Sequence, residues 1–272
     1  MRALNWLSAG AGYRIVLRDL APIGDLPRVA DAMASLRLQH RLKAVVAPAP
    51  AGKIAVLAPH PDDEAIGPGG TLLAARAAGA RIAVGFATDP DARRREAETA
   101  SADLGADTRF FGYRQRSIPV DAPAARALAE WIDGTAPAAL FVPFLADDHD
   151  DHRRISEWLL SAARSGGMTA RPEIWAYQVY TSMPCTTLVD MTSFAESKRA
   201  LIARHESQNR TRDWASISLG LNAYNARFAG NGAKGRLYEG FFVLPCDAYL
   251  DLCQRYFGID PASCYRSGSY ES

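Results

Sequence analysis

The sequence lacks the features that mark membrane-spanning, nucleic-acid-binding and secreted proteins. No apolar run approaches the ~18 residues that a membrane-spanning helix needs. The 272 residues carry a formal net charge of only +1, so the basic face that non-specific nucleic-acid binding requires is not expected. The first twenty residues do not resemble a secretory signal, because polar residues interrupt their apolar run and charges return at Arg14 and Arg18. We therefore expect a cytoplasmic protein with no nucleic-acid partner and no transmembrane segment.

Cysteine is also scarce, and composition is otherwise ordinary. The four cysteines form no CxxC pair and are expected to be reduced thiols. A hydrophobic fraction of 48% and a charged fraction of 22% are typical of a globular chain. The length allows one large domain with an appendage. We expect an N-terminal extension over residues 1–50, packed on the core with a helix at 27–42, and one domain over 51–272.

From residue 53 onward, short apolar runs alternate with helical patterns. Runs rich in β-branched residues predict strands, and helical periodicity between them predicts helices. The expected strands are 53–58, 81–88, 109–113, 138–144 and 173–180, and the expected helices are 70–80, 91–106, 121–134 and 152–167. This alternation predicts an α/β fold with a mostly parallel sheet and helices on both faces. Ligands bind such sheets outside the carboxyl ends of the strands.

The pattern changes after residue 180. Residues 193–210 predict one strong helix with Ser193 as its cap, supported by Glu196 three positions later. Residues 209–236 are polar, aromatic and glycine-rich, which indicates long loops with room for one short helix. The run at 237–245 predicts a final strand. Apolar side chains in the loop region would cover a large, partly apolar substrate or fill a satellite core; they are Trp214, Leu219, Leu221, Tyr224 and Phe228.

The stretch "APHPDDEAIGPGG" (58–70) places a histidine and three acids where the first strand meets a helix. Acids can cap a helix N-terminus, but capping does not explain a histidine just before them. A phosphate loop is disfavoured because clustered carboxylates repel a pyrophosphate and no GxGxxG is present. A metal site is the third interpretation, with His60 and Asp63 as one nitrogen and one oxygen ligand.

A second loop favours the metal site. The strand predicted at 138–144 runs into "LADDHDDH" (145–152) and then into a helix. Three of the five histidines thus lie in two loops that each follow a strand. The acids lack the spacing of an EF-hand, and calcium prefers oxygen ligands throughout. Two histidines and one carboxylate are instead typical of a catalytic zinc shell with open positions.

These motifs resemble the LmbE-like / PIG-L family of zinc-dependent N-acetylglucosamine de-N-acetylases. "APHPDDEAIGPGGTL" resembles the AHPDDE signature, and "HDDH" (149–152) resembles the family's HxDH element. Weaker similarities are "RRRE" (93–96), "KRALIARHESQ" (198–208) and "YEGF" (238–241). The resemblance covers roughly residues 53–245. About fifty residues precede the first strand, more than many members of the family carry, and the region 211–236 has no counterpart in it.

The resemblance implies a Rossmann-like fold and a mononuclear site for Zn²⁺ or another divalent metal. The implied metal ligands are His60, Asp63 and His152. Asp62 would be the general base. His149 would stabilise the oxyanion or protonate the leaving amine, with Asp151 orienting it. Arg93 would lie on the substrate side.

The resemblance therefore implies zinc-dependent hydrolysis of the N-acetyl amide of an N-acetylglucosaminyl conjugate. The family also acts on glucosaminyl-inositols, chitooligosaccharides and sugars of glycopeptide antibiotics, so an antibiotic-biosynthesis role is among the expectations. A longer N-acyl group or a thiol conjugate is the alternative substrate, and a non-catalytic sugar-binding protein is a remote one. Peripheral contact with a membrane is compatible with this sequence, which does not specify the oligomeric state.

Overall fold

The structure is a computed structural model that describes residues 44–88, 91–230 and 233–257. The helix predicted at 27–42 lies outside these ranges, as does nearly all of the expected N-terminal extension. The described residues belong to one compact unit, Lys43–Tyr265. The domain boundaries expected at residues 50 and 51 stay a prediction.

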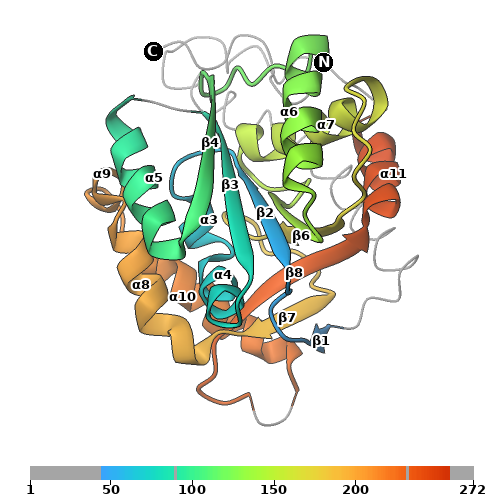
Figure 1. The fold of residues 1–272 in the computed structure, drawn as a ribbon. Helices are drawn as coiled ribbons and strands as arrows, with labels where there is room; N and C mark the ends of the chain where they lie inside the picture. The colour runs from blue at the N-terminus through green and yellow to red at the C-terminus, as the bar shows by residue number, and fades with distance from the viewer. Residues whose placement is uncertain (1–43, 89–90, 231–232, 258–272) are drawn as a thin grey trace, which may run out of the picture. The chain divides into compact units, whose positions relative to one another are not determined.

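An eight-stranded sheet forms the centre of the described unit (Figure 1). Its strand order is β1-β7-β8-β6-β5-β2-β3-β4, and β8 alone runs antiparallel to its neighbours. The strands are β1 (Val45–Val46), β2 (Lys53–Ala58), β3 (Arg81–Thr88), β4 (Ala106–Tyr113), β5 (Ala139–Pro143), β6 (Glu173–Tyr177), β7 (Thr187–Asp190) and β8 (Tyr238–Pro245). The predicted mostly parallel α/β sheet is confirmed, whereas β1, β7 and the direction of β8 were not predicted.

Helices cover both faces of this sheet, as predicted. Helices α6, α7 and α11 pack together on one face, and α3, α4, α5, α8 and α10 pack on the other (Figure 1). The helices are α3 (Asp63–Ile66), α4 (Gly69–Ala77), α5 (Asp91–Leu104), α6 (Ala122–Thr135), α7 (Asp150–Ser165), α8 (Ala195–Ala203), α9 (Glu206–Asn209), α10 (Trp214–Asn225) and α11 (Cys246–Phe257), with 3₁₀ turns η3 (Thr192–Phe194) and η4 (Ala226–Phe228). Within the described ranges, no helix is long and apolar enough to cross a membrane.

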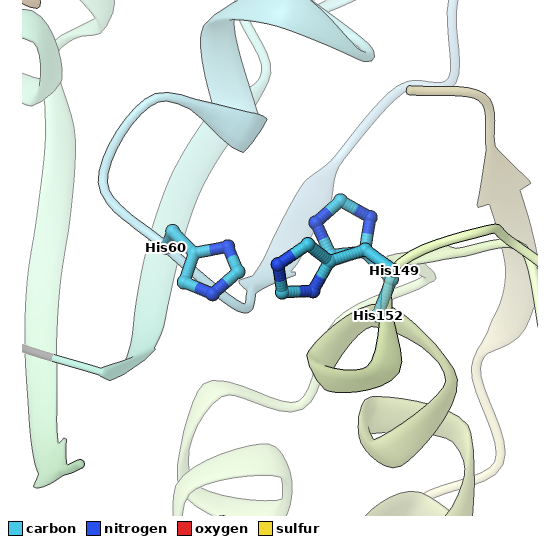
Figure 2. A group of neighbouring side chains, drawn as sticks. All are labelled: His60, His149 and His152. Atoms are coloured by element: carbon cyan, nitrogen blue, oxygen red, sulfur yellow. The ribbon is translucent and has the colours of Figure 1, made fainter. Parts of the chain in front are cut away.

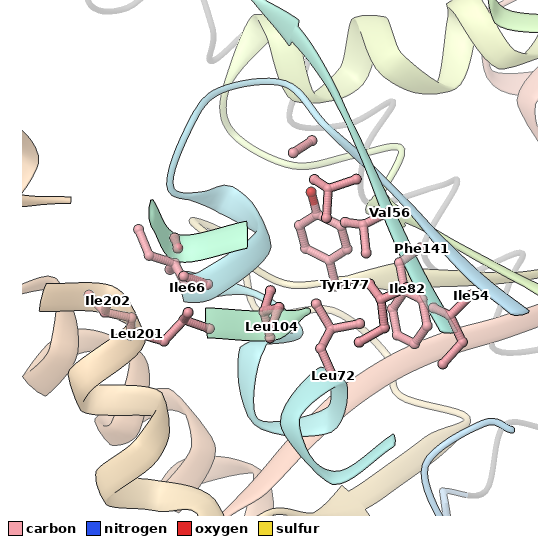
Figure 3. Close-up of a cluster of buried hydrophobic side chains, with 14 of the residues drawn as sticks. Ile54, Val56, Ile66, Leu72, Ile82, Leu104, Phe141, Tyr177, Leu201 and Ile202 are labelled. Carbon is pink, nitrogen blue, oxygen red and sulfur yellow. The ribbon is translucent and has the colours of Figure 1, made fainter. Parts of the chain in front are cut away.

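The central strand β2 is buried on both faces, as expected for an apolar run in the middle of a parallel sheet. Ile54 and Val56 alternate along it and contribute to one hydrophobic cluster with Ile82 of β3 and Phe141 of β5 (Figure 3). Leu72 of α4 belongs to the same cluster. Burial of such side chains is the main favourable term in folding. The cluster therefore fixes the strands whose carboxyl ends carry the two histidine loops.

The single helix predicted at 193–210 is wrong. The segment is divided into η3, α8 and α9, and no side chain caps η3 or α8. Asp190 instead accepts a hydrogen bond from the backbone N–H of Thr192, at 3.0 Å. The break after Ala203 places the buried imidazole of His205 2.8 Å from Glu64. Helical periodicity does not encode this long-range contact, so the sequence pattern alone suggested a continuous helix.

The loop region expected at 209–236 contains a twelve-residue helix, α10. Asp213 caps it by accepting the N–H of Ser216 at 2.9 Å. Half of its buried residues are polar: Ser218 donates to the carbonyl of Ile66, and Asn222 accepts from Lys198. The apolar periodicity that marks a packed helix is therefore weak here. The prediction allowed one short helix within long loops, and the structure has a helix of twelve residues at 214–225.

An ion pair between Lys198 of α8 and Glu239 of β8 is completely enclosed, with Nζ 2.5 Å from Oε1. Lys198 also donates to the carbonyl of Gly67. Glu239 accepts the N–H groups of Gly70 and Thr71 at the start of α4, at 2.8 and 2.7 Å. The pair thus ties α8, β8 and the glycine-rich turn together.

Replacing Lys198 by Met should lower the free energy of unfolding by about 3–5 kcal/mol, because it leaves the Glu239 carboxylate buried without its cation. Urea denaturation measures this loss. The double variant with Glu239→Gln removes both charges and should recover part of it. A loss below about 1 kcal/mol for the single variant would show that the ion pair does not stabilise the fold.

Candidate metal centre and active site

The two predicted loops meet at one edge of the sheet. From β2 the chain proceeds to β3 and β4 on one side, and then returns to β5 on the other side of β2. The carboxyl ends of β2 and β5 therefore flank the point where the strand order reverses, which is where open α/β sheets bind ligands. One ring nitrogen from each of His60, His149 and His152 lies within 4.8 Å of the others (Figure 2).

Asp63 connects two of these histidines. Its Oδ2 lies 3.1 Å from Nδ1 of His60, and its Oδ1 lies 3.3 Å from Nε2 of His152. The backbone N–H of His60 also donates to Oδ2, at 2.9 Å. All three side chains are buried. The predicted ligand set is thus brought together around one carboxylate.

The other ring nitrogen of each of the two histidines lies against a second carboxylate. Oδ2 of Asp151 lies 2.8 Å from Nε2 of His60, and Oδ1 of Asp147 lies 3.4 Å from Nδ1 of His152. The backbone N–H of Arg116 donates to both oxygens of Asp151. Carboxylates placed in this way orient histidine ligands and raise their basicity.

The residues fit a divalent metal on two observations. Neither ring nitrogen of His152 makes a hydrogen bond, although both are buried. Burial opposes a charge on this ring, but Asp63 and Asp147 outweigh it and raise the pKa of His152 to about 10. The cluster therefore attracts positive charge, and a metal ion would replace the proton. Nitrogen and carboxylate donors of this kind suit zinc and related transition metals.

His149 is the histidine closest to the surface and has a different environment. It is the N-cap of α7, where its Nδ1 accepts the N–H of Asp151 at 3.1 Å. This bond leaves the proton of the neutral ring on Nε2. Burial lowers the pKa of His149 to about 4, and His152 and His60 add to the shift. His149 thus presents a neutral N–H donor.

Asp151 contacts two of the three histidines through different groups. Its carboxylate lies against His60, while its backbone N–H donates to His149. The expected orientation of His149 by Asp151 stays a prediction, and the position of the carboxylate suggests that it also supports His60.

The predicted base Asp62 is held in an unusual state. Burial raises its pKa to about 7, and the neighbouring Asp63 charge adds to the shift against the opposing effect of Arg93. Nη2 of Arg93 lies 2.8 Å from Oδ2 of Asp62, and Arg93 also donates to the carbonyl of Pro61. A carboxylate with a pKa near neutrality is suited to accept and return a proton. The structure thus pairs Arg93 with the predicted base Asp62.

The backbone of Asp62 is strained, with a φ of 127°. Non-glycine residues rarely adopt such values, and they cluster at functional sites. Glu64 accepts the N–H of Asp62 at 3.0 Å, and its other oxygen lies 2.8 Å from His205. Glu64 and His205 are both fully buried. They hold the strained turn, and sequence reasoning did not assign them this role.

The signals for these missed residues were present in the sequence. The third acid of the first motif is Glu64, and the late similarity at 198–208 contains both Lys198 and His205. In the same way, Glu96 of "RRRE" accepts the N–H and the hydroxyl of Ser207, at 2.8 and 2.7 Å. Single residues in weak motifs become interpretable only when the fold shows what they contact.

Two aromatic residues border the histidines. The ring of Tyr180 lies 5.8 Å from that of His149 and 5.6 Å from that of Trp214, measured between centroids. Tyr180 is 45% exposed, and its backbone N–H donates to Asp147. Trp214 is the first residue of α10. The rim of the site is therefore partly aromatic.

The fold and the buried histidine–aspartate cluster define an α/β protein with a candidate metal centre at its switch point. Residues 55–163 match the family described as PIG-L, GlcNAc-PI de-N-acetylase. This match spans the two histidine loops and confirms the predicted resemblance to the LmbE-like / PIG-L family. No curated protein matches the chain significantly.

Solved structures with the same fold include enzymes of more than one reaction type. N,N'-diacetylchitobiose deacetylase from Pyrococcus horikoshii is 21% identical, with a TM-score of 0.60 over 72% of this chain and 85% of that one. The 4-carboxy-2-hydroxymuconate hydratase GalB from Pseudomonas putida is 19% identical, with a TM-score of 0.60 over 71% and 96%. The teicoplanin deacetylase Orf2 is 16% identical, with a TM-score of 0.56 over 72% and 99%. At these identities the likeness establishes the fold.

Proposed function

We propose that this chain is a metal-dependent amidohydrolase that removes acetate from an N-acetylglucosaminyl conjugate. The observation that carries the proposal is the position of Asp63 between His60 and His152. Asp62 precedes Asp63 in the same turn, and the ring of His149 lies 4.8 Å from that of His60. The match to a de-N-acetylase family supports it, as does the fold shared with the chitobiose deacetylase.

The metal would be held by His60, Asp63 and His152. When bound, a divalent ion such as Zn²⁺ would polarise the amide carbonyl and acidify a water molecule. Asp62 accepts the proton of the attacking water, which its pKa of about 7 allows near neutral pH. Arg93 holds the Asp62 carboxylate in place.

His149 then acts on the substrate side. Because its Nδ1 is occupied by the backbone of Asp151, the Nε2–H is the group free to donate to the developing oxyanion. The proton collected by Asp62 is available for the leaving amine. Hydrolysis of an unactivated amide needs proton transfer to the leaving amine and stabilisation of the oxyanion, and each of the two loops supplies one of these functions.

An amidase for a longer acyl group or a thiol conjugate is the second candidate. The same residues would perform that reaction, because they act on the amide and not on the rest of the substrate. The teicoplanin deacetylase is a fold neighbour, and a substrate of the glycopeptide-antibiotic type is accordingly one member of the proposed class. A sugar-binding role without catalysis is disfavoured by the strained, perturbed Asp62.

Acetate release from a panel of N-acetylglucosaminyl compounds tests the function. We expect the zinc-loaded protein to release acetate from one conjugate in the panel and to stop when a chelator is added. The panel holds N-acetylglucosamine, N,N'-diacetylchitobiose, N-acetylglucosaminyl-inositol and an N-acetylglucosaminylated glycopeptide aglycone, together with the matched N-octanoyl analogues. Release of octanoate alone would move the assignment to the longer-acyl amidase. Absence of any release, with one zinc bound per chain, would contradict the proposed reaction on these acceptors.

A further inference from the structure

We propose that the exposed flank of α10 and η4 docks on the surface of an anionic lipid bilayer. Four apolar side chains follow one another there at intervals of four, three and four residues, which places them on one side of the helix. This apolar stripe consists of Ile217, Leu221, Tyr224 and Phe228. Ile217 is 48% exposed, Tyr224 is 47% exposed and Phe228 is 36% exposed. Together with Tyr180 they are most of the large hydrophobic side chains exposed in the described ranges.

The segment that carries the stripe has mainly positive charges, and we call its five basic residues the basic border. Residues 210–236 contain five basic side chains and one acidic one, Asp213. The basic residues, all exposed, are Arg210, Arg212, Arg227, Lys234 and Arg236. Arg236 is paired with Asp190, and the guanidinium of Arg227 lies 3.7 Å from the ring centre of Tyr224 and 4.2 Å from that of Phe228. Arg227 thus joins the apolar stripe to its basic border.

An apolar stripe bordered by arginine and lysine is the composition of helices that lie in a bilayer interface. The acyl region receives the apolar side chains, and anionic headgroups receive the basic ones. The net charge of the whole chain is only +1, so the excess of positive charge at 210–236 is local. Charge complementarity therefore selects a negatively charged surface as the occupant.

Two other occupants fit this charge pattern less well. Residues 27–42 of the same chain carry three arginines and one aspartate, so they repel the basic border. A second copy of the chain, related by two-fold symmetry, would place the basic border against itself. Both arrangements bring like charges together, whereas an anionic bilayer does not.

The stripe lies next to the candidate active site. Trp214 begins α10 and contacts Tyr180, whose ring lies 5.8 Å from that of His149. Ile217 follows Trp214 by less than one turn. On the proposed function, this position would present the metal centre to a glycoconjugate anchored in the bilayer. The docking itself does not depend on that function and can be measured without catalysis.

Vesicle co-sedimentation of the full chain tests the proposal. The protein should pellet with vesicles of phosphatidylcholine containing ~30% phosphatidylglycerol and bind them at least tenfold better than phosphatidylcholine alone, since each basic residue near an anionic surface contributes about fivefold. Raising NaCl to ~0.5 M should weaken binding strongly. The triple variant Ile217→Ser, Tyr224→Ser, Phe228→Ser should lose tenfold or more, and so should Arg227→Glu.

The matched control removes exposed apolar surface elsewhere. Val45 and Val46 on β1 are 57% and 53% exposed, and replacing both by Ser should leave vesicle binding unchanged. Equal binding to neutral and anionic vesicles would overturn the proposal, as would equal losses in the control. A fall in thermal stability of the triple variant with no change in vesicle binding would show instead that the stripe is covered by the protein itself. Acetate release from a soluble substrate is measured separately, so failure of docking and failure of the proposed reaction are distinguishable.

Discussion

Replacing Asp62 by Asn should lower kcat by about 10²–10⁴-fold and leave one metal ion bound per chain, because the change removes a proton acceptor and no ligand. Asn keeps the size of the side chain and can still contact Arg93. The loss should therefore appear in kcat more than in KM. Steady-state kinetics of acetate release, with metal analysis of the same sample, separates these effects.

The matched control for this variant is Asp148→Asn, an exposed acid in the second loop. It changes the same charge on the same edge of the sheet and should retain full activity. If Asp62→Asn kept more than about a tenth of the wild-type kcat, Asp62 would not be the general base. If it lost the metal as well, Asp62 would be a ligand and the roles of Asp62 and Asp63 would have to be exchanged.

Replacing His152 by Ala should abolish stoichiometric metal binding. His152 is fully buried, with its Nε2 3.3 Å from Asp63 and its Nδ1 3.4 Å from Asp147, so the change removes one of the three proposed ligands and nothing on the surface can replace it. Dialysis against a competing chelator, followed by elemental analysis, measures the affinity. Circular dichroism of the same samples shows whether the variant is folded.

Three further variants test which residues hold the metal. Asp151→Asn keeps all three proposed ligands but weakens the support of His60, and it should cost about 10–100-fold in metal affinity. His149→Ala should retain the metal and lose turnover, because His149 is proposed as a donor to the substrate. The three histidines lie close enough for an alternative all-histidine site. Loss of metal in His149→Ala and its retention in Asp63→Asn would establish that alternative.

Much of the central fold could be predicted because its signals are local. The buried strand at 53–58 is a short apolar run, and the helix at 121–134 begins behind Asp121, which caps it with a 3.0 Å bond to the N–H of Ala124. That the two histidine loops lie on the same edge followed from the predicted parallel direction of their strands, since carboxyl ends of parallel strands lie on one edge.

What could not be predicted depends on contacts between distant residues. Nothing near Glu64 in sequence indicates that His205 lies against it, and the break in the helix at 193–210 has the same origin. The buried side of α10 uses Ser218 and Asn222, which hydrophobic periodicity does not detect. The strained backbone of Asp62 also has no sequence signature, because the motif shows an ordinary aspartate.

The position of β8 has a consequence for the order in which the molecule is assembled. This strand is nearly the last element of the described chain, yet it lies between β6 and β7. Its Glu239 accepts the N–H of Gly70, 169 residues earlier. During synthesis, β1 and β7 therefore cannot join the rest of the sheet until residues 238–245 have left the ribosome. Until then, the N–H groups of the glycine-rich turn beside the candidate metal centre also lack the Glu239 carboxylate as their acceptor. Contacts of such long range fold slowly. A nascent chain that stops before β8 would thus expose two unpaired strand edges and would lack the carboxylate that holds the turn beside the candidate metal centre.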